Sequence, residues 1–149
     1  DRLTPKRAQY TFLCNENGGV VDDLIIYMLE EEHYLLVVNA ANIEKDYNWL
    51  VEHNTYPNEK VEIIDESDHY SILAIQGPLA EKTLQQLTDT DLSQINSFCF
   101  ETEVEFEGIS DATMVSRSGY TGEDGFEVYV SPESAADLWN ALLEAGKGD

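Results

Sequence analysis

Hydrophobic and polar residues alternate along several segments of the chain, with the two-residue period that is typical of β-strands. In residues 126–130, for example, Phe126, Val128 and Val130 share one face, while Glu127 and Tyr129 share the other. This pattern predicts strands at residues 8–14, 20–29, 33–38, 61–64, 70–75, 98–107, 113–117 and 126–130. Short turn-prone segments separate the first three, which predicts an antiparallel meander at the start of the chain.

Three other segments carry the longer period of amphipathic helices. Apolar residues recur at helical spacing after Asn42, which predicts a helix at residues 43–53 with Asn42 as its N-cap. Pro78 stands where a first helical turn tolerates proline and predicts a short helix at residues 79–87, and a last helix is expected at residues 133–144. Helices interspersed among meandering strands predict an α+β fold with largely antiparallel sheets.

The length of 149 residues and the 42% hydrophobic content suit one domain, or one large piece of a larger fold. No apolar run reaches the roughly 18 residues that span a bilayer. The chain starts at Asp1 rather than at a methionine and ends directly after a helical pattern, so we expect a fragment with both ends cut.

A net charge of −22, from 30 acidic and 8 basic residues, argues against nucleic acid as a partner, because no basic stripe is present to neutralise phosphates. Anionic membranes are disfavoured for the same reason. The acidic residues are scattered rather than gathered in a tail, which indicates a solvated charged surface. We expect a soluble protein of the bacterial or archaeal cytoplasm.

The cysteines and histidines predict no metal site. Cys14 and Cys99 are too far apart to form a metal cluster, and the three histidines show no ligand spacing with one another or with either cysteine. Each cysteine lies in a strand-like run, so we expect two buried structural thiols in a reducing compartment.

Two carboxylates, Asp22 and Asp23, interrupt the otherwise apolar strand predicted at residues 20–29. Aspartate is depleted from strands, and a carboxylate in apolar surroundings is costly unless another group pairs with it. Successive side chains of a strand face opposite ways, so only one of the two can point into a given pocket. From the pattern alone, we expect one aspartate to cap the turn at residues 15–19 and the other to lie at a solvated sheet edge.

Glycine recurs at every third position in residues 119–125. Glu123 and Asp124 would repel a phosphate, and the spacing is not that of a P-loop or a dinucleotide-binding turn. The pattern alone predicts a tight loop between two strands, in which Tyr120 is either packed or exposed. It also predicts that Glu127 is a solvated strand residue.

Five segments occur together in the order and approximate spacing of one enzyme family. They are Ala8–Thr11, Asn17–Leu24, Val38–Asn42, Ile75–Pro78 and Gly119–Glu127. In them the chain resembles the aminomethyltransferase, or T-protein, of the glycine cleavage system. The likeness covers essentially all of residues 1–149 but only the middle of that enzyme, which implies a partial folate-binding core without the N-terminal segment and the C-terminal domain.

The resemblance implies that the parent enzyme transfers an aminomethyl group from lipoylated H-protein to tetrahydrofolate, with release of ammonia and without a metal. The essential aspartate of the family is the second of the pair, here Asp23, which lies near the pterin and stabilises positive charge during transfer. The residues implied to bind folate are Tyr10, Ile25, Tyr27, Asn39, Arg117, Tyr120 and Glu127. For Arg117, two roles stay open: it binds an acidic group of the folate tail, or it pairs with neighbouring acidic side chains.

Two other readings remain open. The chain could be the folate-binding portion of a demethylating oxidoreductase of the dimethylglycine or sarcosine type, which a flavin domain elsewhere in the gene would indicate. It could also be a non-catalytic folate-binding module, although tRNA-modifying relatives of that kind carry a cysteine in the glycine loop and residues 119–125 contain none. We expect the isolated chain to have no aminomethyl-transfer activity.

Overall fold

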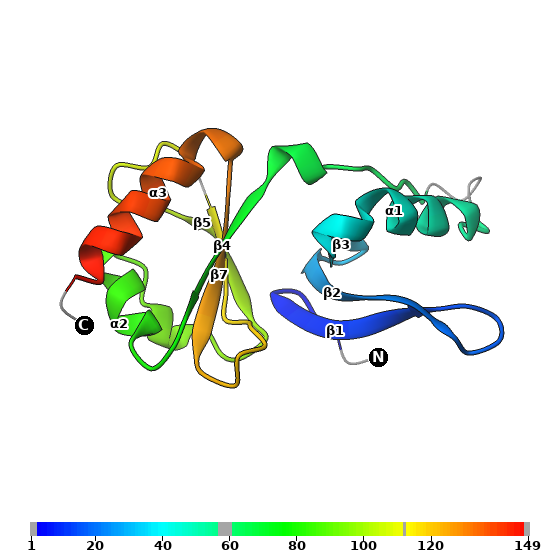
Figure 1. Cartoon of the computed structure of the whole chain (residues 1–149), viewed down its shortest axis with the longest axis horizontal. Helices are drawn as coiled ribbons and strands as arrows, with labels where there is room; N and C mark the ends of the chain where they lie inside the picture. Colours follow the sequence, from blue (N-terminus) through cyan, green and yellow to red (C-terminus); the bar gives the residue numbers. More distant parts are fainter. Residues whose placement is uncertain (1–2, 57–60, 112, 148–149) are drawn as a thin grey trace. The chain divides into compact units, whose positions relative to one another are not determined.

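The computed structural model describes residues 3–56, 61–111 and 113–147 (Figure 1). The chain forms two compact units, which we call the N-terminal unit (up to residue 67) and the C-terminal unit (from residue 68). Each is described by itself. No helix in the described ranges is long and apolar enough to cross a membrane.

The N-terminal unit begins with the predicted meander. Its strands β1 (Arg7–Cys14), β2 (Val20–Glu30) and β3 (His33–Val38) form one antiparallel sheet with β2 in the centre. The β1–β2 turn is held by Asn15, whose Oδ1 accepts hydrogen bonds from the backbone N–H groups of Asn17 (3.0 Å) and Gly19 (2.9 Å). The expectation that an aspartate caps this turn is therefore wrong, because Asn15 within the turn already serves that function.

Helix α1 (Ile43–Glu52) follows a short 3-10 turn, Ala40–Asn42. Asn42 occupies the predicted N-cap position, but its side chain makes no capping hydrogen bond. The amide instead donates to Asp22 of β2, at 2.5 Å. The competing carboxylate explains why the predicted cap is not formed.

The strand expected at residues 61–64 is absent, since residues 61–66 have no regular structure. Val61 and Ile64 are largely exposed, so the segment buries no apolar face against a neighbouring strand. A four-residue alternation without such a partner does not suffice to form a strand.

The C-terminal unit contains one antiparallel sheet in the order β4-β7-β6-β5. Its strands are β4 (Ser71–Gln76), β5 (Phe100–Val104), β6 (Thr113–Ser116) and β7 (Gly125–Val130). β5 is shorter than predicted, because the positive φ angle of Phe98 precludes extended backbone before Phe100 and the strand ends at Val104. The largely antiparallel α+β prediction is confirmed.

Two helices cover one face of this sheet: α2 (Ala80–Leu84) and α3 (Pro132–Ala145) (Figure 1). The single helix predicted at residues 79–87 is instead α2 followed by a 3-10 turn, Gln85–Leu87. There the Gln85 amide donates to the carbonyl groups of Thr88 and Thr90, both at 2.9 Å, which favours a tighter turn over continued helix.

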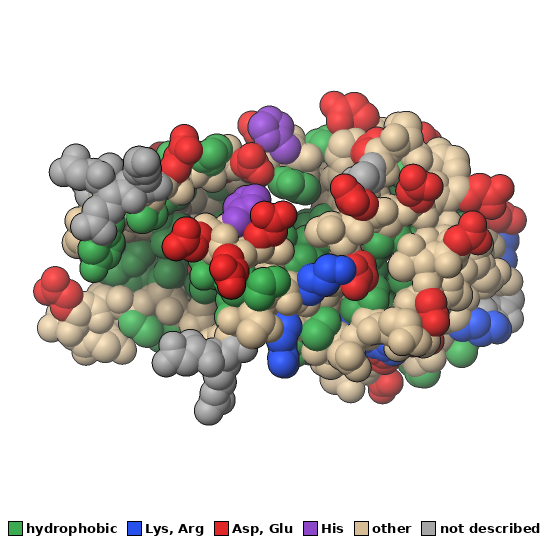
Figure 2. Space-filling model, turned by 180° about the vertical axis from the view of Figure 1, so that it is seen from behind, with side chains coloured by type: hydrophobic (Ala, Val, Ile, Leu, Met, Phe, Trp, Pro, Cys, Tyr) green, Lys and Arg blue, Asp and Glu red, His purple; other side chains and the backbone are tan. Residues whose placement is uncertain are grey.

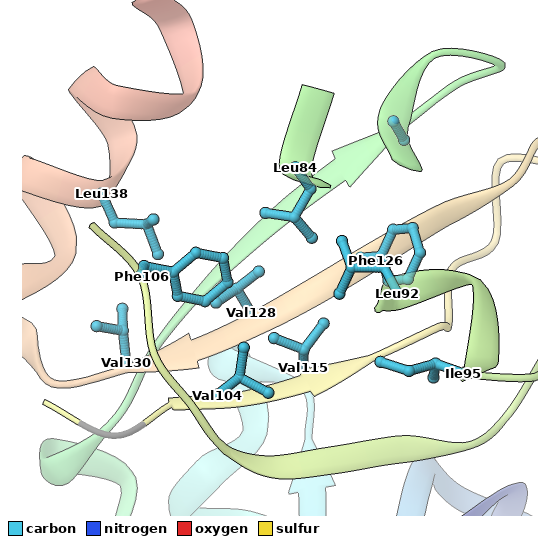
Figure 3. Packing of buried hydrophobic residues seen from close by; sticks show 11 residues of the cluster. Leu84, Leu92, Ile95, Val104, Phe106, Val115, Phe126, Val128, Val130 and Leu138 are labelled. Atoms are coloured by element: carbon cyan, nitrogen blue, oxygen red, sulfur yellow. The ribbon is translucent and has the colours of Figure 1, made fainter. Parts of the chain in front are cut away.

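The core of the C-terminal unit lies between these helices and the sheet (Figure 3). Phe126, Val128 and Val130 of β7 point together into it, as their alternation predicted, and meet Leu84 of α2 and Leu138 of α3. All five side chains are essentially inaccessible to solvent. Burial of each stabilises the unit by about 1.5–3 kcal/mol before the loss of conformational entropy is counted.

Asp111 fastens the start of α3 to the loop before β6. Its carboxylate accepts hydrogen bonds from Ser134 Oγ (2.7 Å), Ser131 N (3.1 Å) and Ser110 Oγ (3.0 Å). Hydrogen bonds from Ser131 and Ser134 lower the pKa of Asp111 from 3.8 to about 2. A lowered folded-state pKa means that this stabilisation is complete above about pH 4 and is lost as the pH falls toward 2.

We therefore expect Asp111→Ala to lower the free energy of unfolding at pH 7, with a difference from the parent chain that shrinks between pH 4 and pH 2. Urea denaturation followed by circular dichroism over a pH series measures this. Asp137→Ala, at an exposed position of α3, is the control and should change stability little. A deficit for Asp111→Ala that is the same at pH 7 and pH 2 would contradict the assignment.

Candidate functional site

Asp22 and Asp23 lie in the central strand of the N-terminal sheet, paired in register with Leu13 and Phe12 of β1. Their side chains project to opposite faces, as the strand period requires. Asp22 is buried, with 9% of its surface exposed, whereas Asp23 is half-buried. The two carboxylates therefore occupy different environments.

Asp22 is held by four donors. Its Oδ1 accepts from the backbone N–H of Asp23 and from Asn39 Nδ2, both at 2.9 Å. Its Oδ2 accepts from Asn42 Nδ2 (2.5 Å) and from Lys45 Nζ (3.2 Å). The backbone hydrogen bond from Asp23, together with the bonds from these side chains, lowers the pKa of Asp22 well below its ordinary value. Asp22 is thus an ionised carboxylate that is held from within the protein.

Asp23 has fewer partners. Tyr10 Oη donates to its Oδ2 at 2.8 Å, and Asn39 Nδ2 lies 3.1 Å from its Oδ1. The hydrogen bond from the Tyr10 hydroxyl to the Asp23 carboxylate raises the pKa of Tyr10. A carboxylate can accept about four hydrogen bonds, so Asp23 keeps capacity for a ligand.

Aromatic rings flank this carboxylate on β1. Tyr10 and Phe12 are each about half exposed, at 50% and 51%, and their rings meet edge to face with centroids 5.3 Å apart. Ile25 is paired with Tyr10 across the strands and is half-buried, and Tyr27 is fully buried. The structure thus brings Tyr10, Asp23, Ile25 and Asn39 together on the N-terminal sheet, with Tyr27 below the surface.

Three residues next to Asp22 were missed by sequence reasoning as site residues. Asn42 was assigned only a capping role, and Lys45 and Asp46 were not singled out. Their spacing of three and four residues was the available signal, because it places Asn42, Lys45 and Asp46 on one face of a helix. The Lys45 ammonium also donates to the carbonyl of Val21, at 2.9 Å.

The other predicted site residues belong to the C-terminal unit. Tyr120 is 98% exposed in the loop between β6 and β7. Glu127 of β7 is half-buried and accepts a hydrogen bond from Ser118 Oγ. The prediction from pattern alone that Glu127 is simply solvated was therefore incomplete, because one carboxylate oxygen has a protein partner.

Arg117 is engaged by its own unit. Its guanidinium forms ion pairs with Asp124 and with Glu81 (2.6 Å), and the group lies 4.9 Å from the ring centre of Phe126. The pKa of Arg117 is raised, chiefly by the hydrogen bond to Asp124 and also by Glu81. Of the two roles left open, the structure shows the pairing with neighbouring acids.

The glycines of the loop make room for Gln76, the last residue of β4. Its Nε2 donates to the carbonyl groups of Ser118 (3.2 Å) and Phe126 (3.3 Å). A Cβ at Gly119 or Gly125 would overlap the Gln76 amide. The segments Ile75–Pro78 and Gly119–Glu127 are thus parts of one packed arrangement.

We expect Gly125→Ala to lower the free energy of unfolding by about 1–3 kcal/mol, because it displaces the Gln76 amide from its carbonyl acceptors. Adding Gln76→Ala removes the overlap and should recover part of the loss, as a urea denaturation double-mutant cycle would show. Gly146→Ala is the control, since its nearest contact would be an ordinary 3.4 Å. A double variant no more stable than Gly125→Ala would rule out this explanation.

A family model described as "GCVT N-terminal domain" matches residues 1–149. The chain belongs to the GCVT N-terminal domain family.

Members of the GCVT N-terminal domain family include close relatives of this chain. The aminomethyltransferase of Oceanobacillus iheyensis is 51% identical over 148 residues, which cover 99% of this chain and 40% of the relative. That of Anoxybacillus flavithermus is 56% identical over 146 residues, covering 98% of this chain and 39% of the relative. The chain thus spans about two fifths of the length of these relatives.

A solved structure of the glycine cleavage system aminomethyltransferase T from Bartonella henselae superposes with a TM-score of 0.76 at 32% identity. The match covers 98% of this chain and 37% of that protein. It supports the α+β architecture described above for this member of the GCVT N-terminal domain family.

Within the described part of this GCVT N-terminal domain, no group of three or more histidine, cysteine or acidic side chains could hold a metal ion. Both cysteines are free thiols, Cys99 half-buried and Cys14 exposed. The expectation of two buried thiols is wrong for Cys14, which is exposed at the end of β1, where the pairing with β2 shifts register. Figure 2 shows acidic side chains spread over the visible face of both units, with few basic ones among them.

Proposed function

We propose that the complete protein containing this chain is an aminomethyltransferase of the glycine cleavage system. Its substrates would be tetrahydrofolate and the aminomethyl group on lipoylated H-protein. The family membership and the names of the relatives support this proposal, and favour it over the demethylating oxidoreductase and the non-catalytic module. The bacterial sources of the relatives support a bacterial protein, for which we propose a cytoplasmic location.

The observation that carries the proposal is the contrast between the two aspartates. Asp22 is buried and receives four donors, whereas Asp23 is half-buried beside the exposed ring of Tyr10 and keeps unused acceptor capacity. A carboxylate with that capacity, next to an aromatic ring, suits a flat heterocycle that carries N–H donors and develops positive charge.

In the proposed reaction, the transferred carbon leaves the lipoyl sulfur and the amino nitrogen and becomes bonded to N5 and N10 of tetrahydrofolate. The protons of N5 and N10 end on ammonia and on the lipoyl thiol. Asp23 would orient the folate and stabilise the positive charge on the carbon as N5 attacks. The hydrogen bonds from Tyr10 and Asn39 hold the Asp23 carboxylate in place for this role.

Ile25 and Tyr27 would support the folate from the Asp23 face of the sheet. In the C-terminal unit, Tyr120 is available to stack on an aromatic ligand, and Glu127 to accept hydrogen bonds from pterin N–H groups. Arg117 would contribute only by fixing the glycine loop, because its guanidinium is already paired with Glu81 and Asp124.

An assay of the complete gene product with aminomethylated H-protein and tetrahydrofolate tests the proposal. We expect ammonia and 5,10-methylenetetrahydrofolate in equal amounts. The 149-residue chain alone should form neither product, because a site assembled from several segments cannot keep its geometry when some of these segments are missing. Failure of the complete protein, or oxidation of sarcosine or dimethylglycine by it, would overturn the proposed function.

A further inference from the structure

A third carboxyl group, that of Asp46, lies near the aspartate pair. Asp46 of α1 has no exposed surface, and neither of its carboxyl oxygens accepts a hydrogen bond within the described ranges. An ionised carboxylate without donors in such a position is strongly disfavoured. The group therefore needs either a cation at close range or a proton.

The available cation is committed elsewhere. Lys45 Nζ lies 3.2 Å from Asp22 Oδ2 and 3.7 Å from Asp46 Oδ1, so it is within hydrogen-bonding distance of Asp22 only. One ammonium group beside two carboxylates leaves one negative charge unbalanced. A proton on one of the two carboxyl groups removes this excess.

The donors decide which carboxyl group keeps the proton. Asp22 receives four hydrogen bonds that favour its ionised form, whereas Asp46 receives none. Burial and the nearby Asp22 carboxylate raise the pKa of Asp46, and Lys45 opposes them only in part. The proton therefore belongs on Asp46, directed at Asp22.

We propose that Asp46 is protonated at neutral pH and donates a hydrogen bond to Asp22, and that it thereby acts as a positioning residue for Asp23. The link to Asp23 is short, because Asp22 Oδ1 accepts the backbone N–H of Asp23 and Asn39 Nδ2 contacts both carboxylates. The positioning role rests on the proposed aminomethyl transfer.

Two substitutions at Asp46, made in the complete gene product, distinguish a proton donor from a charge partner of Lys45. Asp46→Asn is neutral and has an N–H donor that can replace the acid O–H. Asp46→Leu keeps the branched shape at Cγ but has no donor. We expect Asp46→Asn to keep kcat close to that of the parent, and Asp46→Leu to lower kcat about tenfold with little change in KM for tetrahydrofolate.

Equal losses in kcat for the Asn and Leu variants would overturn the proposal, since a charge partner of Lys45 is lost in both. The Leu variant alone could lose thermal stability and kcat together, with KM changed as much as kcat. That result would show that Asp46 is only a structural residue, and it would also contradict the proposal. Asp137→Asn, exposed on α3, is the control for a neutralised aspartate.

An infrared measurement on the parent protein does not depend on any variant folding. A protonated carboxylic acid has a C=O stretch that an ionised carboxylate lacks. We expect this band at neutral pH in the parent and in Asp23→Asn, and its loss in Asp46→Asn. Absence of the band from the parent overturns the proposal. If the band is present but the complete gene product has no aminomethyl-transfer activity, Asp46 is protonated, but the positioning role and the proposed function are both refuted.

Discussion

Replacing Asp23 by asparagine in the complete gene product is expected to lower turnover about 100-fold while changing the affinity for tetrahydrofolate far less. Asparagine keeps the shape, its Oδ1 can accept the hydrogen bond from Asn39, and its Nδ2 can donate to Tyr10 Oη, but it removes the negative charge. The charge matters most when positive charge develops on the transferred carbon. Steady-state kinetics and calorimetric titration of tetrahydrofolate measure the two quantities separately.

Asp22→Asn is the comparison for this prediction. Asp22 faces Asn39, Asn42 and Lys45 inside the N-terminal unit, so its neutralisation should mainly lower stability. Equal losses of turnover and of folate affinity in Asp23→Asn, or no loss of either, would contradict an electrostatic role for Asp23.

Arg117→Met should destabilise the C-terminal unit by about 2 kcal/mol. Removing one member of a buried ion pair costs about 3–5 kcal/mol, but Glu81 and Asp124 are 36% and 43% exposed, and solvent screens part of this loss. The variant also frees the carbonyl groups of Leu92 and Ile95, which accept hydrogen bonds from the Arg117 guanidinium.

Urea denaturation of Arg117→Met and of Lys147→Met tests this estimate. Lys147 pairs with Glu144 at the exposed end of α3, where both side chains are at least 70% exposed, so loss of this pair should cost less than about 0.5 kcal/mol. Similar effects of the two substitutions would show that the Arg117 pairs are no stronger than surface pairs.

Long alternating segments predicted their strands well. The three strands of the meander and β7 begin and end within a residue or so of the expected positions, because each pairs along its length with a neighbour. The short segment at residues 61–64 has the same local pattern but no strand partner. Local pattern cannot reveal whether a partner exists, since pairing depends on residues far along the chain.

The candidate site was only partly predictable. The sequence marked Asp22 and Asp23 as unusual, and the family resemblance, rather than the pattern, selected Asp23. Beyond its helical spacing from Asn42, Asp46 gave no signal, because its significance comes from complete burial beside Asp22, which is 24 positions away in the sequence. The pairing of Arg117 with Glu81 across 36 positions was hidden for the same reason.

A crystal structure of the complete gene product with tetrahydrofolate bound tests the central claim most directly. We predict that the folate contacts the Asp23 carboxylate beside the ring of Tyr10, and that Asp22 keeps its hydrogen bonds to Asn39, Asn42 and Lys45. A folate that contacts Asp22 instead, or that binds away from Asp23, would contradict the division of roles between the two aspartates.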